Sequence, residues 1–248
     1  MHIVLSFLLC FFFTMSVDAQ EAATSADVVQ GQVEELGLSF LREQSGVETV
    51  GMSYYKTAKI QPDFKDWAQR TDKIKETPIY DRELAATSEF NRLQNKFANF
   101  ESDTPIIIHA SIDLNRYSER QETLFLPYFY PELYFPYDVY GMPVAVLVQN
   151  IDRFREIYLP GADAETMFSK ADGSTKALVE ITLLPILADH ERTLQLDPED
   201  KTGFHPMLMK VAQMAIWTVN EPQIPLWVWR DPEYSPKEDK ELLNLYKK

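Results

Sequence analysis

Cysteine, glycine and positive charge are all scarce in this 248-residue chain. The single cysteine excludes a disulfide framework and any zinc site built on several cysteines. Eight glycines are about half the usual share of ~7 %, which argues against glycine-rich phosphate-binding loops. The formal net charge is -14. It argues against nucleic acid as a partner, because a phosphate backbone requires a basic surface.

Long hydrophobic runs are confined to the N-terminus. Residues 3–13 read IVLSFLLCFFF, and Val-Asp-Ala follows at 17–19. This pattern is typical of a secretory signal peptide, 1–19, that is cleaved after Ala19. A membrane anchor would need ~20 apolar residues, and this run is shorter. We therefore predict a secreted or periplasmic protein with no transmembrane segment after cleavage.

Removal of the signal peptide would also remove the only cysteine, Cys10. In an oxidising compartment such a chain depends on burial alone, and ~200 residues suffice for one good core. Residues 20–30 are mostly small and polar and predict a flexible linker. We expect residues 31–248 to form a single α+β domain, because they contain no repeat and no clear further linker.

Helical periodicity comes first along this domain. Apolar residues in 33–41 recur at helical spacing and predict a helix that ends near Gly46. Residues 63–74 predict a second, short helix. A Thr-Pro cap at 77–78 and a following apolar stripe predict a third helix that runs to about Asn99.

Strand signals follow Pro105. Apolar and polar residues alternate along much of 106–114, as in a half-buried strand. Residues 207–219 fit a helix or a strand, and we favour a strand because 220–223 then turn into a hairpin with 226–230. The other expected elements are strands at 124–129, 144–149 and 177–187, a strand at 192–196 paired back onto 177–187, and short helices at 163–171 and after Ser235. Together they predict N-terminal helices packed on a mainly antiparallel sheet.

The glycines and serine of 46–53 have the spacing of a phosphate-binding P-loop. Met52 stands where that loop has the lysine that reaches the phosphates. Because this charge carries much of the mechanism, we expect no nucleotide binding here.

Ser53 also begins a Ser-x-x-Lys motif that ends at Lys56. A Ser-Asp-Thr tripeptide at 102–104 and a Lys-Thr-Gly tripeptide from Lys201 follow in order. The series resembles the active-site elements of serine β-lactamases and penicillin-binding proteins, with Thr104 where that family has asparagine. The resemblance implies Ser53 as nucleophile, Lys56 as manager of its proton and Lys201 in the third element. A cell-envelope hydrolase is therefore the alternative function.

The histidine spacing predicts no metal site. His109, His190 and His205 form neither a His-Glu-x-x-His nor a His-x-His motif. On a strand, Asp189 and Glu191 would share a face without His190, so a solvated turn is favoured over a metal cage. We predict neither a metal nor a cofactor.

Aromatic residues are concentrated at 125–140, where eight of them stand among three prolines. Proline breaks the hydrogen-bond ladder of a strand, so we expect an irregular excursion between two strands. Tyrosine and tryptophan offer large contact areas with a polar tip. The candidate binding residues are Tyr128, Tyr130, Tyr134, Tyr137 and, on one face of a later strand, Trp227 and Trp229.

Two interpretations of these rings stay open. They could form a platform for sugar rings or a hot-spot patch for a protein. Alternatively, the segment could cap the sheet and fill a second small core. The leading hypothesis is a non-enzymatic exported binding or accessory protein, with an unknown protein or glycan as its partner.

The order of parts resembles uncharacterised families of bacterial exported proteins. These have a signal peptide, an N-terminal helical stretch, an isoleucine-rich strand and further strands. The resemblance rests on residues 112–117, IDLNRY, followed by 124–127, LFLP, and covers about 79–230. It implies a bacterial exported protein of unknown function and assigns no catalytic residue.

Overall fold

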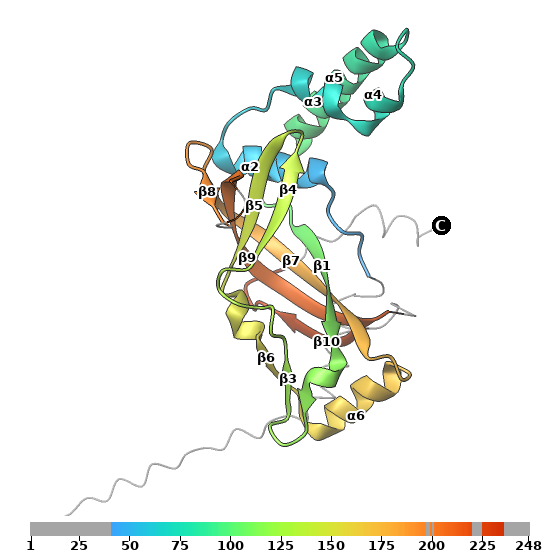
Figure 1. The fold of residues 1–248 in the computed structure, drawn as a ribbon, viewed down its shortest axis with the longest axis vertical. Helices are drawn as coiled ribbons and strands as arrows, with labels where there is room; N and C mark the ends of the chain where they lie inside the picture. Colours follow the sequence, from blue (N-terminus) through green and yellow to red (C-terminus); the bar gives the residue numbers. More distant parts are fainter. Residues whose placement is uncertain (1–40, 197–198, 200, 220–224, 236–248) are drawn as a thin grey trace, which may run out of the picture.

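A computed structural model describes residues 41–196, 199, 201–219 and 225–235 (Figure 1). These residues form an α+β fold, as predicted, with four helices ahead of the first strand. Within this described part, no helix is long and apolar enough to cross a membrane. The expected signal peptide, the linker and the helix after Ser235 lie outside the described residues.

One mixed sheet forms the centre of the fold. Its two longest strands, β7 (Lys176–Ala188) and β9 (Gly203–Thr218), run antiparallel along most of their length. β1 (Ile106–Asp113) pairs with the other side of β7 and is one edge of the sheet. The other side of β9 is divided between β5 (Met142–Gln149), which is parallel to it, and β10 (Pro225–Arg230), which is antiparallel.

The other edge of the sheet is β4 (Tyr134–Val139), which pairs with β5. Because β5 and β9 are parallel, the expectation of a mainly antiparallel sheet is met only in part. The strand expected at 207–219 and its hairpin partner are confirmed by β9 and β10, and their connecting residues lie outside the described chain. The partner expected for 192–196 is wrong, since β8 (Leu194–Gln195) pairs with the start of β9.

The remaining short elements lie around this sheet. The strand expected at 124–129 is β3, which ends at Phe125 and belongs to a separate small sheet. The helix expected at 163–171 is α6, which lies near β10. The bounds of these elements are β2 (Tyr117–Ser118), β3 (Thr123–Phe125), β6 (Glu156–Tyr158), α6 (Gly161–Lys170) and the 3-10 helices η1 (Leu114–Arg116) and η2 (Ile151–Phe154).

Helix α2 (Val47–Ala58) is absent from the sequence-based expectations. Its buried residues run consecutively from Val50 to Tyr54 and include Gly51 and Ser53, so large apolar residues alone do not mark the buried face. The helix packs against β7 and β4. Residues 41–46, where the first predicted helix would end, are not helical, and Gly46 instead precedes α2.

The helix expected at 63–74 divides at Thr71 into α3 (Phe64–Arg70) and α4 (Asp72–Glu76). The third predicted helix is α5 (Arg82–Asn99), which begins after a turn rather than at the Thr-Pro cap. These three helices stand together at one end of the molecule, beyond α2 (Figure 1). The main contact of the N-terminal helices with the sheet is therefore made by α2.

Gly51 allows α2 to approach its neighbours closely. A Cβ at this position would lie 2.5 Å from Val139 Cγ1 and 3.0 Å from Trp67 Cη2. We expect Gly51→Ala to lower the free energy of unfolding by about 1–2 kcal/mol in urea titrations, because overpacking outweighs the gain of ~1 kcal/mol in helix propensity. Gly161→Ala is the control, since its Cβ would meet nothing nearer than Glu122 Oε1 at 3.9 Å. A Gly51→Ala protein as stable as the wild type would contradict this packing.

Candidate functional site

The first half of the aromatic segment, residues 126–133, is irregular as expected, and it closes a pocket of about 180 Å3 beside β1. The apolar walls are Ala110, Ile112, Phe125, Leu126, Pro127, Phe129, Leu133 and Phe135. The polar lining residues are Ser111, Asp113, Arg116, Tyr128 and Lys176. The second half of the segment differs from the expectation of an irregular excursion, because it forms β4. This strand accommodates Pro136 because it is an edge strand.

Main-chain hydrogen bonds hold the irregular segment in place. The Leu126 N–H donates to the Arg155 carbonyl at 2.8 Å, and the Phe129 N–H donates back to the Leu126 carbonyl at 3.1 Å. The side chains of Leu126 and Phe129 are buried in the core. The pocket therefore has one wall on a strand and one on a turn that main-chain hydrogen bonds anchor.

The pocket lining carries more positive than negative side chains. Lys176 Nζ lies 3.7 Å from Asp113 Oδ2, because β1 and β7 place these two residues opposite each other. Arg116 is exposed and has no ion pair among the described residues. Two cations thus accompany one carboxylate, although the whole chain carries a formal charge of -14. The pocket can hold an apolar group that has an anionic group beside it.

The predicted tyrosines divide between the surface and the fold. Tyr128 is 72 % exposed and lines the pocket, and Tyr130 is 40 % exposed on the same segment. Tyr134 packs against Phe204, with ring centroids 6.0 Å apart. Tyr137 is half-buried, and burial raises the pKa of its hydroxyl. One part of the segment is therefore exposed, as a binding surface would be, and another part packs on the fold, as a cap would.

Trp227 and Trp229 do not line the pocket. Both are half-buried and pack on the main core, and β10, which carries them, is separated from β1 by β7 and β9. The Trp229 ring lies 4.8 Å from that of Phe154, with the Arg153 guanidinium 4.1 Å from the Trp229 centroid. This geometry is that of a structural stack.

Sequence reasoning missed Arg116 and Lys176 as pocket residues. They lie 60 positions apart, and only the pairing of β1 with β7 brings Lys176 beside the pocket. Phe125 and Phe135 belong to the aromatic cluster that the sequence displays, but the pattern does not show which rings face inward.

Ser53 lies in the middle of α2 and is fully buried, and its hydroxyl donates to no described residue. Lys56 Nζ lies 4.6 Å above the centroid of the Phe97 ring. Lys201 is exposed on the connection between β8 and β9. The interpretation of these three residues as a catalytic set stays a prediction. The residues that the structure describes contain no group of three or more His, Cys, Asp or Glu side chains that could hold a metal ion.

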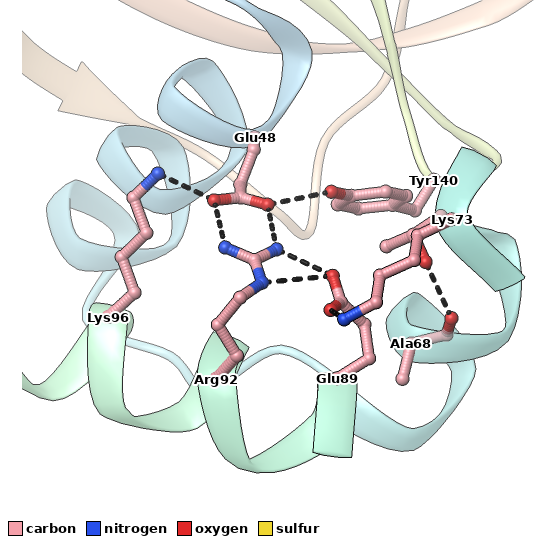
Figure 2. Close-up of polar contacts among 8 residues, drawn as sticks. Glu48, Ala68, Lys73, Glu89, Arg92, Lys96 and Tyr140 are labelled. Atoms are coloured by element: carbon pink, nitrogen blue, oxygen red, sulfur yellow. Dashed lines mark hydrogen bonds and ion pairs between the residues drawn. The ribbon is translucent and has the colours of Figure 1, made fainter. Parts of the chain in front are cut away.

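A second hollow, of about 460 Å3, lies between α2, the α3–α5 helices and the turn after β4. Arg92 lines it and forms paired hydrogen bonds to Glu48, at 3.0 and 2.5 Å, and to Glu89 Oε1, at 3.0 and 2.7 Å (Figure 2). Lys96 Nζ lies 2.6 Å from Glu48 Oε1, and the Tyr140 hydroxyl donates to Glu48 Oε2 at 3.3 Å. These contacts join α2, α5 and the turn that follows β4. We call the group formed by Glu48, Glu89, Arg92, Lys96 and Tyr140 the ionic joint.

The electrostatics of this ionic joint are satisfied internally. Burial alone would raise the pKa of Glu48, but hydrogen bonds from Arg92 and Lys96 outweigh it and lower the pKa from 4.5 to about 2. Burial raises the pKa of the Tyr140 hydroxyl. The other cations at the hollow, Arg70 and Lys75, are paired with Asp66 at 2.8 Å and Asp72 at 3.0 Å. Each cation that lines the hollow is thus paired with a carboxylate of the described residues, whereas Arg116 at the aromatic pocket is not, so the aromatic pocket is the better candidate site.

No protein-family model, no curated protein and no solved structure matches this chain.

Proposed function

We propose that this is an exported, non-enzymatic binding or accessory protein that holds one apolar group of its ligand in the aromatic pocket beside β1. The observation that carries the proposal is an apolar pocket whose lining includes an exposed tyrosine, Tyr128, and a cation, Arg116, that has no ion pair among the described residues. Export is part of the proposal through the signal-peptide pattern of residues 1–19.

The size of the pocket favours a protein ligand over a free small molecule or glycan. At about 180 Å3 it is smaller than the ~300–1,000 Å3 that sites for whole drug-sized ligands occupy. It therefore takes one side group, such as a phenyl or isobutyl group, while the rest of the ligand lies outside. An anchor of this kind is typical of protein interfaces.

The hydrolase alternative has less support. A nucleophile needs contact with its substrate and a neighbouring base, whereas Ser53 has no exposed surface and the Lys56 ammonium stands over the Phe97 ring. The pocket lining itself contains no histidine or cysteine that could act as base or nucleophile.

Titration with 3-phenylpropionate, which combines a phenyl ring with a carboxylate, tests the pocket. In 1H–15N spectra we expect saturable shifts at residues 110–113 and 125–135. Ala110→Leu fills the pocket and should weaken binding at least tenfold, whereas Tyr80→Ala, at a 94 % exposed site on the α4–α5 turn, should leave it unchanged. Equal binding by the wild type and Ala110→Leu would remove the pocket as the binding site.

A further inference from the structure

β1 leaves part of its outer edge open. β7 pairs with β1 along its whole length on the inner side. On the outer side, Ser45 bonds to Ile107 twice: its N–H donates to the Ile107 carbonyl, and its hydroxyl accepts from the Ile107 N–H, both at 2.9 Å. These contacts end there, and no strand of the described chain continues along β1 beyond Ile107.

The main-chain N–H and C=O of Ile107 point away from β7, and this fixes which later residues of β1 also point away from it. Main-chain groups of a strand point to alternate sides, so the N–H and C=O of His109 and Ser111 point outward with those of Ile107. Consistently, the Leu114 N–H donates to Thr175, which directly precedes β7, at 2.9 Å. No other described residue hydrogen-bonds to the four outward groups of His109 and Ser111. Within the described ranges, these groups therefore form an unpaired strand edge.

The described start of the chain does not cover this edge. From Ser45 the chain crosses the face of the sheet: the Arg42 N–H donates to Glu180 of β7 at 2.8 Å, and Leu41 packs near Trp217 of β9. The segment therefore runs away from the outer side of β1 rather than along it.

The aromatic pocket lies on the same stretch of edge. Four consecutive residues of β1, from Ala110 to Asp113, line it, so the pocket lies alongside the part of β1 that carries Ser111. The lining also includes Phe135 of β4, which is the other edge strand of the sheet. A strand added to β1 would lie ~4.8 Å away, with alternate side chains directed into the pocket.

We propose that the open edge and the pocket form one site that binds an extended segment of a partner protein by strand addition. His109 and Ser111 supply the main-chain hydrogen bonds, and the pocket takes one aromatic side chain. Arg116 faces an acidic residue of the segment, since the charges at the pocket are positive in excess. This partner assignment rests on the proposed binding function and follows the division of labour known for strand addition, in which the main chain supplies affinity and a pocket supplies specificity.

The test uses a capped heptapeptide of sequence TEVFVET and the Ser111→Pro variant. Proline at this edge position removes an N–H that bonds to nothing described, and it costs the fold no ladder bond. We expect calorimetric titration to show at least tenfold weaker peptide binding by Ser111→Pro and wild-type binding by Tyr80→Ala, whose 94 % exposed side chain lies on the α4–α5 turn. A peptide N-methylated at alternate amides should bind at least tenfold more weakly to the wild type, which keeps the test valid if Ser111→Pro folds poorly.

The outcomes separate this proposal from the pocket itself. Equal binding of the methylated and unmethylated peptides would overturn strand addition. Binding of 3-phenylpropionate without binding of the peptide would also overturn it and leave the pocket standing, whereas failure of both would remove the binding function. Dimerisation of the free protein that Ser111→Pro abolishes would assign the edge to a second copy and overturn the partner-protein assignment.

Discussion

Replacing Arg42 by methionine is expected to lower the free energy of unfolding by about 3 kcal/mol, because it leaves a buried carboxylate without its cation. The side chain of Glu180 has no exposed surface. It accepts hydrogen bonds from Arg42 Nε at 2.9 Å and Nη2 at 2.5 Å, and Arg42 Nη2 also donates to Thr182. Urea unfolding of the wild type and the variant measures the loss.

A double-mutant cycle separates this ion pair from simple packing. In Glu180→Met, Arg42 keeps a route to solvent, since its side chain is 27 % exposed, so the loss should be smaller. In the double variant Arg42→Met with Glu180→Met, no charge is buried and stability should return to within about 1 kcal/mol of the wild type. Additive losses in the double variant would show that the pair is not coupled.

Acid is expected to weaken the fold through Glu48. Its pKa is about 2 in the folded protein against an ordinary value of 4.5. Because the folded pKa is the lower one, Glu48 stabilises the fold fully above about pH 4.5, and this contribution is lost as the pH falls toward 2. The full shift would correspond to about 3 kcal/mol, and we expect about 2 kcal/mol because Arg92 is 43 % exposed to solvent.

Arg92→Met tests the origin of this acid dependence. The variant removes the guanidinium that bonds both Glu48 and Glu89, so the pKa of each carboxyl should rise and the change in unfolding free energy between pH 5 and pH 2 should shrink. Lys96→Met, which removes a single contact to Glu48, is the control and should shrink it less. An unchanged pH profile in Arg92→Met would show that other carboxyls control acid unfolding.

Local pattern predicted the elements that have one buried face. The alternation from Ile106 onward and the stripe of α5 are visible in the sequence because a polar face accompanies each apolar face. α2 is not visible in this way, because its buried residues include Gly51 and Ser53, which an apolar pattern does not mark. β4 is masked by Pro136, whose effect on a ladder depends on whether the strand is an edge.

The candidate site was predictable in composition but not in geometry. The aromatic cluster marks the segment, and Tyr128 is both predicted and observed at the pocket. The partition between rings that line the pocket and rings that pack elsewhere depends on where strand β4 begins. The cation Lys176 reaches the pocket through pairing between β1 and β7, a long-range register that no short motif records.

The pairing of β9 with four other strands has a consequence for the time course of folding. β9 pairs with β5, β7, β8 and β10, and its first residue is Gly203, so the strand that organises the sheet emerges late in synthesis. The pairs that β1 makes with β7, and β5 with β9, join residues more than 50 positions apart in sequence. A sheet built on such distant contacts closes slowly, and a chain that ends before β9 lacks the strand on which the others assemble.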